Sequence, residues 1–198
     1  MTSDGRIQTA RRTGAEDFRL NGVPFAAKQL DFWQWSASDM VANTMRGVLA
    51  EYIVALALGI ADGMREEWAA WDLTMADATR IEVKSAAYVQ SWQQAKPSVI
   101  SFSVAKSRQW SETSGLGNES SRPAQIYVFA LLAHMDQATL DPLDLDQWVF
   151  YVLPTSVLDA RQRSQHSITL PSLAKLAEPR RFEQLADAVR ECRAGIVS

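Results

Sequence analysis

Apolar and polar residues alternate with different periods along the chain, and these periods predict where helices and strands lie. Residues 48–60 are apolar on nearly every side of a helix that runs through residues 44–58. Asn43 or Ser38 is the predicted N-terminal cap of this helix, and Gly59 is its predicted C-terminal stop. Because the helix lacks a broad polar face, we expect it to be buried rather than to lie on the surface.

Strands are predicted from short runs that are bounded by turn residues. The run 125–134 is apolar throughout, which is typical of a central strand covered on both faces. The Ser- and Gly-rich segment 107–124 is predicted to be a flexible loop. The predicted strands are residues 68–75, 80–86, 98–106, 125–134 and 146–154, and a last amphipathic helix covers residues 182–192. Helices and strands in this order indicate a mixed α/β fold.

The chain of 198 residues is long enough for one domain with a sizeable core. Phe32, Trp33 and Trp35 precede the first predicted helix, where they either pack against the core or stack on nucleic-acid bases. The four predicted segments of this single domain are a mobile arm at 1–20, an aromatic lead-in at 21–40, a core at 41–135 and a completing strand and helix at 136–198.

Composition and charge narrow the class of protein. The longest apolar stretch contains Glu51 and is too short to span a bilayer, so no membrane partner is expected. One cysteine, Cys192, fits a reducing cytoplasm. The net charge of −3 argues against a protein that coats nucleic acid non-specifically. Residues 80–125 and 161–198 are nevertheless basic, and they either line a phosphate-facing surface or form ordinary solvated charge.

Charged residues recur among apolar ones in the segment 80–86. A strand period of two places Ile81 and Val83 on one face, and Glu82 and Lys84 on the other. The second face is either an ordinary solvated Glu–Lys pair or a chemical site.

A second carboxylate is predicted to lie opposite the first. A hairpin that turns at residues 76–78 pairs Met75 with Thr79, and the same register places Asp72 across from Glu82. Like charges so placed repel each other, and a divalent cation between them turns that repulsion into binding. Carboxylate oxygens, waters and substrate phosphate are the ligands that Mg²⁺ prefers.

Glu51 adds a third acid, because it is the only charge in a stretch predicted to be buried. An unpaired buried carboxylate either costs roughly several kcal/mol of folding free energy or becomes protonated, so a partner is expected. Arg46 is five residues away and does not share the same helical face. A metal ion or a basic group held by the hairpin is the expected partner. The alternative is a buried glutamate bonded to Trp or backbone donors.

In order along the chain, Glu51, Asp72 and the Glu82-x-Lys84 pair resemble the signature of the PD-(D/E)XK, or restriction-endonuclease-like, nucleases. The resemblance covers about residues 41–135 and departs from the family pattern in having Trp71 rather than proline before the Asp. It also extends to an uncharacterised bacterial protein group with that core. It implies a mixed central β-sheet flanked by helices, with the three acids holding Mg²⁺ or Mn²⁺ and Lys84 assisting the attacking water.

Other residues near the motif have two interpretations. Ser85, Gln90, Gln93 and Arg46 are possible substrate-binding residues, and a polar strand exit with surface charge explains them equally. In the segment 107–124, the residues Arg108, Trp110 and Arg122 suit either a nucleic-acid clamp or a simple connector.

The function expected from these features is a metal-dependent cytoplasmic nuclease that hydrolyses phosphodiester bonds, with DNA a more frequent substrate of the family than RNA. A homodimer that completes the active site is compatible with the sequence. The alternative is a catalytically inactive module that keeps the fold and binds nucleic acid or protein.

Overall fold

The computed structural model describes residues 9–67, 69–111 and 115–197, and the side chains of residues 108–119 and 197 are outside that description. The chain divides into two compact units, which meet in sequence between Met40 and Val41. The prediction of one domain for all 198 residues stays a prediction.

The N-terminal unit contains a β-hairpin followed by a helix. Strand β1 (Asp17–Leu20) pairs antiparallel with β2 (Val23–Lys28), and Asn21 and Gly22 form the turn with φ angles of 52° and 80°. An Asn-Gly pair favours this turn because both positions need a positive φ. Residues 17–20 were predicted to belong to an arm and instead form β1; part of that arm, residues 1–8, lies outside the described residues.

The aromatic lead-in contains helix α1 (Gln29–Ala37). The Asp31 carboxylate in its first turn accepts a hydrogen bond of 2.7 Å from the Lys28 backbone N–H, which ties the helix to the hairpin. Phe32 and Trp35 on this helix are exposed, so neither is packed in a core.

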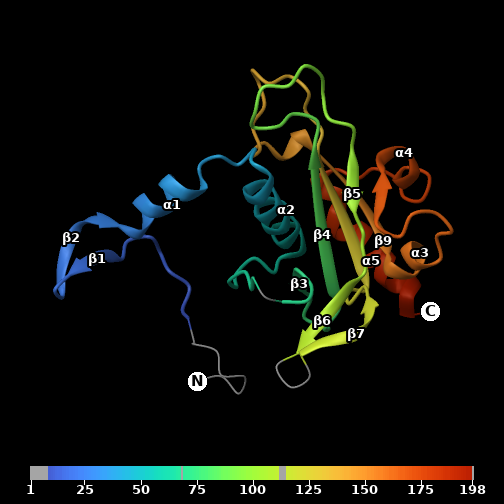
Figure 1. Ribbon diagram of the computed structural model, residues 1–198, viewed down its shortest axis with the longest axis horizontal. Coiled ribbons are helices and arrows are strands. Elements are labelled where there is room, and N and C mark those ends of the chain that lie inside the picture. The colour runs from blue at the N-terminus through green and yellow to red at the C-terminus, as the bar shows by residue number, and fades with distance from the viewer. Residues whose placement is uncertain (1–8, 68, 112–114, 198) are drawn as a thin grey trace. The chain divides into compact units, whose positions relative to one another are not determined.

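The C-terminal unit is built on a four-stranded sheet with the order β3-β4-β8-β9 (Figure 1). β4 runs parallel to β8, whereas the β3–β4 and β8–β9 pairs are antiparallel. The strands are β3 (Leu73–Thr74), β4 (Arg80–Ala87), β8 (Ile126–Leu132) and β9 (Trp148–Pro154). All seven residues of β8 are buried, as predicted for a central strand. The predicted mixed α/β fold with a central mixed sheet flanked by helices is confirmed.

Two long helices cover one face of the sheet. Helix α2 (Asn43–Leu58) packs on β4, helix α5 (Phe182–Val197) packs on β8 and β9, and the helices contact each other. The apolar stripe of α5 buries Leu185 and Val189 completely. One side of α2 is buried, as predicted, and includes Ile53 and Val54, whereas Tyr52 and Leu56 on the other side are exposed.

Short elements cover the opposite face. Phe102 packs edge-to-face on Phe129 of β8, with ring centroids 5.2 Å apart, in a core that includes Leu158 and Ile168. The covering elements are β5 (Ser101–Ser103), β10 (Ser167–Thr169), α3 (Thr155–Asp159) and α4 (Leu170–Leu173), and a 3₁₀ turn, η1 (Leu145–Gln147), precedes β9. Of the helices in the described part of the chain, none has the length and apolar character that a membrane crossing needs.

The ends of α2 were predicted with mixed success. Gly59 ends the helix in the left-handed conformation with φ 69°, as predicted. Neither proposed N-terminal cap is right, because the N-cap residue is Ala42 and no side chain caps it. Asn43 instead accepts a 2.7 Å hydrogen bond from the Arg46 Nη2, and Ser38 follows the last residue of α1.

The flexible loop predicted at 107–124 is wrong for most of its length. Strands β6 (Ser107–Ser111) and β7 (Gly115–Ser121) pair antiparallel, with Ser107 opposite Ser121. Serine and glycine favour turns, but the backbone ladder between two arms satisfies their polar groups equally well. The predicted strand at 68–75 is likewise shorter, since only Leu73–Thr74 are paired.

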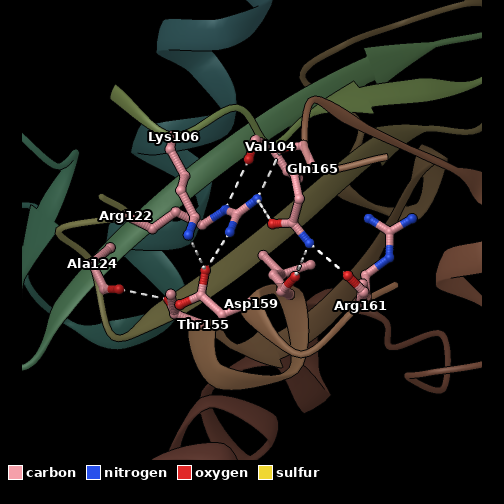
Figure 2. Close-up of polar contacts among 9 residues, drawn as sticks. Val104, Lys106, Arg122, Ala124, Thr155, Asp159, Arg161 and Gln165 are labelled. Atoms are coloured by element: carbon pink, nitrogen blue, oxygen red, sulfur yellow. Dashed lines mark hydrogen bonds and ion pairs between the residues drawn. The ribbon is translucent and has the colours of Figure 1, made fainter. Parts of the chain in front are cut away.

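Arg122 is a structural residue of the C-terminal unit (Figure 2). Its Nε donates 2.8 Å to the Val104 carbonyl, its Nη2 donates 2.9 Å to the carbonyl and side-chain oxygens of Gln165, and its Nη1 pairs with Asp159. The guanidinium thereby fastens the start of β8 to the end of α3. The predicted role of Arg122 in a nucleic-acid clamp does not match this buried position. The side chains of Arg108 and Trp110, the other residues of that prediction, lie outside the described part of the chain.

Candidate active site

The hairpin that carries the acidic motif has the predicted register. Leu73 pairs with Ile81 and Thr74 with Arg80, and the Met75 N–H donates 2.9 Å to the Thr79 carbonyl. The ladder ends at Leu73, and the Asp72 backbone N–H donates to the Ile81 carbonyl, so the predicted pairing of Asp72 with Glu82 stays a prediction.

Ala78 closes the three-residue turn with φ 66°. A left-handed residue at the third position is the usual geometry of such a turn. The length of the loop thus fixes the register in which Leu73 and Thr74 pair with Ile81 and Arg80.

Asp72 extends the hairpin with its side chain. Its backbone N–H donates 3.1 Å to the Ile81 carbonyl, and its Oδ2 accepts a 2.7 Å hydrogen bond from the Val83 N–H. The carboxylate thus occupies a place where a strand would offer a backbone carbonyl, which fixes its position next to Glu82.

Glu82 and Lys84 share one face of β4, as predicted, and they form an ion pair. Their neighbours in β8 are Tyr127 and Phe129, so the ion pair lies at the margin of the core that includes Leu158 and Ile168. The Glu82 side chain is 15% exposed and the Lys84 side chain is 31% exposed. Burial raises the pKa of Glu82, the charge of Lys84 lowers it, and the charges of Asp72 and Glu51 raise it further.

Glu51 has a basic partner in the segment that precedes the hairpin. Arg65 binds it with two hydrogen bonds, Nε to Oε2 at 2.5 Å and Nη2 to Oε1 at 3.1 Å. Glu51 is 13% exposed and Arg65 39% exposed. Burial raises the pKa of Glu51, the Arg65 hydrogen bond lowers it, and the charge of Asp72 raises it.

A pocket of about 240 Å³ joins these groups. Glu51 reaches it from α2, Asp72 from the hairpin and Arg65 from the connecting segment, while the rest of its lining is mainly apolar. The structure thus brings Glu51 and Asp72 into one pocket, and Asp72 close enough to Glu82 for its charge to raise the pKa of Glu82. Figure 1 shows α2 and β4, which contain Glu51 and Glu82, and β3, which directly follows Asp72.

The three acids fit a divalent cation by their chemistry, although their present contacts are with the side chains of Arg65 and Lys84 and with the Val83 N–H. Within the described ranges, no three His, Cys, Asp or Glu side chains are grouped to hold a metal ion, and Glu51 and Glu82 face Arg65 and Lys84. Neighbouring carboxylates raise one another's pKa because their negative charges repel, and a bound cation offsets that repulsion. Oxygen ligands of this kind suit Mg²⁺.

The other predicted substrate-binding residues are spread over different environments. The buried Arg46 donates 3.3 Å from Nη1 to the side-chain oxygen of the buried Gln90 and 2.9 Å to the Val41 carbonyl, which ties α2 to the loop after β4. Ser85 lies on the face of β4 next to Gly47 of α2, opposite to that of Glu82. Gln93 is exposed. Their predicted roles in substrate binding stay predictions.

Sequence reasoning missed two residues of the site. Arg65 lies in an irregular segment, 14 positions after Glu51, so no period connects them. Tyr127 neighbours Glu82 in the parallel pairing, and burial followed by the Glu82 charge raises its pKa to about 12. Tyr127 lies in the apolar run that predicted a central strand, and nothing in that run indicates that its hydroxyl lies near Glu82.

A mixed sheet flanked by helices, with acids from a helix and a hairpin at one pocket, is consistent with an α/β nuclease core. The sequence model of the bacteriophage T4 endonuclease IV family matches residues 27–170, and the chain belongs to this family. Compared with curated proteins, the sequence gave no match. The family supports a nuclease that acts on nucleic acid.

Proposed function

We propose that the protein is a metal-dependent nuclease of the PD-(D/E)XK type that hydrolyses phosphodiester bonds in DNA. The observation that carries this proposal is the Asp72 carboxylate, which accepts a hydrogen bond from the Val83 N–H beside Glu82 in the chain and shares a pocket with Glu51. Membership of an endonuclease family supports the reaction class.

Glu51, Asp72 and Glu82 are the residues that would hold Mg²⁺ or Mn²⁺. Such a cation, when bound, supplies Lewis-acid stabilisation of the charge on the phosphate. The protein contributes partly buried carboxylates, and the Val83 N–H orients the one on Asp72.

Lys84 is the proposed partner of the attacking water. Its ammonium lies on the face of β4 that carries Glu82 and keeps its position through that ion pair. From there it orients a water molecule by hydrogen bonding and stabilises the negative charge that grows on the phosphate during attack. DNA is proposed ahead of RNA, and a cytoplasmic location and a homodimer belong to the same proposal.

The experiment is cleavage of labelled single- and double-stranded DNA and RNA in Mg²⁺, in Mn²⁺ and in chelator. Wild type is compared with Lys84→Ala and Asp72→Asn, which should each lose roughly 10²- to 10⁴-fold in rate. Asp187→Asn is the control, because Asp187 is an exposed carboxylate on α5 that pairs with Arg190 of the same helix.

The outcomes separate the nuclease from its alternative. Chelator-sensitive cleavage that both site variants abolish and Asp187→Asn retains supports the proposal. Absence of cleavage and of metal-induced thermal stabilisation would favour a binding module, in which Arg65 and Lys84 permanently neutralise the acids.

A further inference from the structure

Arg65 shares a pocket with two of the proposed metal ligands, yet it belongs to neither the helix nor the hairpin. Both hydrogen bonds to Glu51 come from one edge of its guanidinium, through Nε and Nη2. Its side chain is 39% exposed, so it is not enclosed by protein. A guanidinium can bind phosphate oxygens with the same fork geometry that it uses for carboxylates.

The contact with Arg65 competes with metal binding. Each Glu51 oxygen accepts one hydrogen bond from Arg65, so a cation that takes Glu51 as a ligand meets a positive charge already in place. Separation of the pair frees both groups at once: the carboxylate for the cation, and the guanidinium for an anion. Asp72 and Glu67 add negative charge around Arg65 and favour its presence in the empty pocket.

We infer that Arg65 is a phosphate-binding residue of this site, held by Glu51 while the site is empty and transferred to a substrate phosphate when Glu51 takes up a divalent cation. This inference rests on the proposed nuclease function. It predicts that Arg65 opposes metal binding in the free protein and supports substrate binding in the complex, two effects of opposite sign from one side chain.

The test measures metal affinity and nucleic-acid binding separately from cleavage. Mn²⁺ is titrated into the free protein by calorimetry, and a labelled DNA oligonucleotide is bound in Ca²⁺ with detection by fluorescence anisotropy. The variants are Arg65→Ala and Arg65→Lys. Arg180→Ala is the matched control, because Arg180 is 37% exposed and its side chain pairs with Glu191 on α5.

Arg65→Ala should bind Mn²⁺ roughly two- to fivefold more tightly than wild type, the range that a partly exposed ion pair provides. It should bind the oligonucleotide and cleave DNA roughly 10- to 100-fold less well, as loss of a charge-assisted phosphate contact requires. Arg65→Lys should fall between the two, since lysine keeps the charge and loses the fork. Arg180→Ala should match wild type in all three measurements.

Two failures are distinguishable. If wild type binds Mn²⁺ but Arg65→Ala leaves Mn²⁺ affinity or oligonucleotide binding unchanged, the inference is wrong and the nuclease proposal stands. Weaker Mn²⁺ binding by Arg65→Ala would also overturn the inference, because it would make Arg65 a residue that only orients Glu51. If wild type binds no Mn²⁺ and cleaves nothing, the proposed function fails and the inference fails with it.

Discussion

Glu82 links the stability of the fold to pH. Burial and the charges of Asp72 and Glu51 hold its pKa above the ordinary glutamate value. Between the ordinary value and the raised folded value, the folded state therefore binds more protons than the unfolded state. The Glu82 contribution to stability accordingly falls as pH rises through that window and is constant above it.

Glu82→Gln should therefore flatten the decline in the free energy of unfolding as pH rises from about 4.5, measured by urea unfolding in chelator. Part of the decline with pH should remain in Glu82→Gln, because the pKa of Glu51 is also raised. Glu183→Gln, a change at an exposed glutamate on α5, is the control and should leave the slope unchanged. A wild-type slope in Glu82→Gln would show that Glu82 does not carry this linkage.

Arg122 should be among the most costly side chains to remove. Arg122→Met deletes the contacts with Asp159, Val104 and Gln165 and leaves buried acceptors without donors. We expect a loss of about 3–5 kcal/mol in the free energy of unfolding by urea. Arg193→Met, which removes a partly exposed ion pair with Asp77, should cost about 1 kcal/mol or less. Equal costs for both variants would contradict the structural role of Arg122.

Single residues could be predicted from sequence where the backbone alone positions them. A three-residue loop pairs Leu73 with Ile81, as residue counts predict, and this hairpin brings the charge of Asp72 close to Glu82. Arg65 and Arg122 could not be placed in the same way. Their partners lie 14 and 37 positions away along the chain and are brought near only by tertiary packing.

At the scale of elements, Gly59 is the clearest determinant of where α2 ends. Its φ of 69° is left-handed, and its backbone N–H donates to the carbonyls of Ala55 and Leu56. Gly59→Ala forces a side chain into this conformation and should cost about 1 kcal/mol in the free energy of unfolding. Thermal and urea unfolding would measure it.

The control for Gly59 is Gly63→Ala. Gly63 also has open space around its Cα and does not have a left-handed φ, so the same added methyl should be close to neutral there. If the two variants are equally stable, the left-handed cap does not contribute to the end of α2.

Elements with strong periodicity were predictable, and elements stabilised by pairing alone were not. β8 could be predicted from its apolar run, and α5 from the spacing of Leu185 and Val189. In both elements the buried positions are apolar, so their spacing in the sequence reflects the element. β6 and β7 consist largely of serine and glycine and have no such period. Their existence depends on backbone hydrogen bonds between two arms, which composition does not reveal.

At the scale of the whole molecule, the core and the family resemblance do not begin at the same residue. All described hydrophobic residues that are buried lie between Leu49 and Val189, in the C-terminal unit. The match to the endonuclease family begins earlier, at residue 27, and so includes α1. Segment 27–40 is therefore part of the family match without adding to the described core.

Removal of residues 1–40 should consequently separate stability from activity. Since the core lies after Leu49, the shortened chain should unfold cooperatively in urea, with a free energy of unfolding within about 1 kcal/mol of the full chain. Nucleic-acid binding should fall about tenfold or more, because the deletion removes the exposed Phe32 and Trp35, which are suited to stacking on bases. Phe32→Ala with Trp35→Ala in the full chain should reproduce the loss of binding, and removal of residues 1–10 is the control. A shortened chain that fails to fold would instead show that the two units form one cooperative domain.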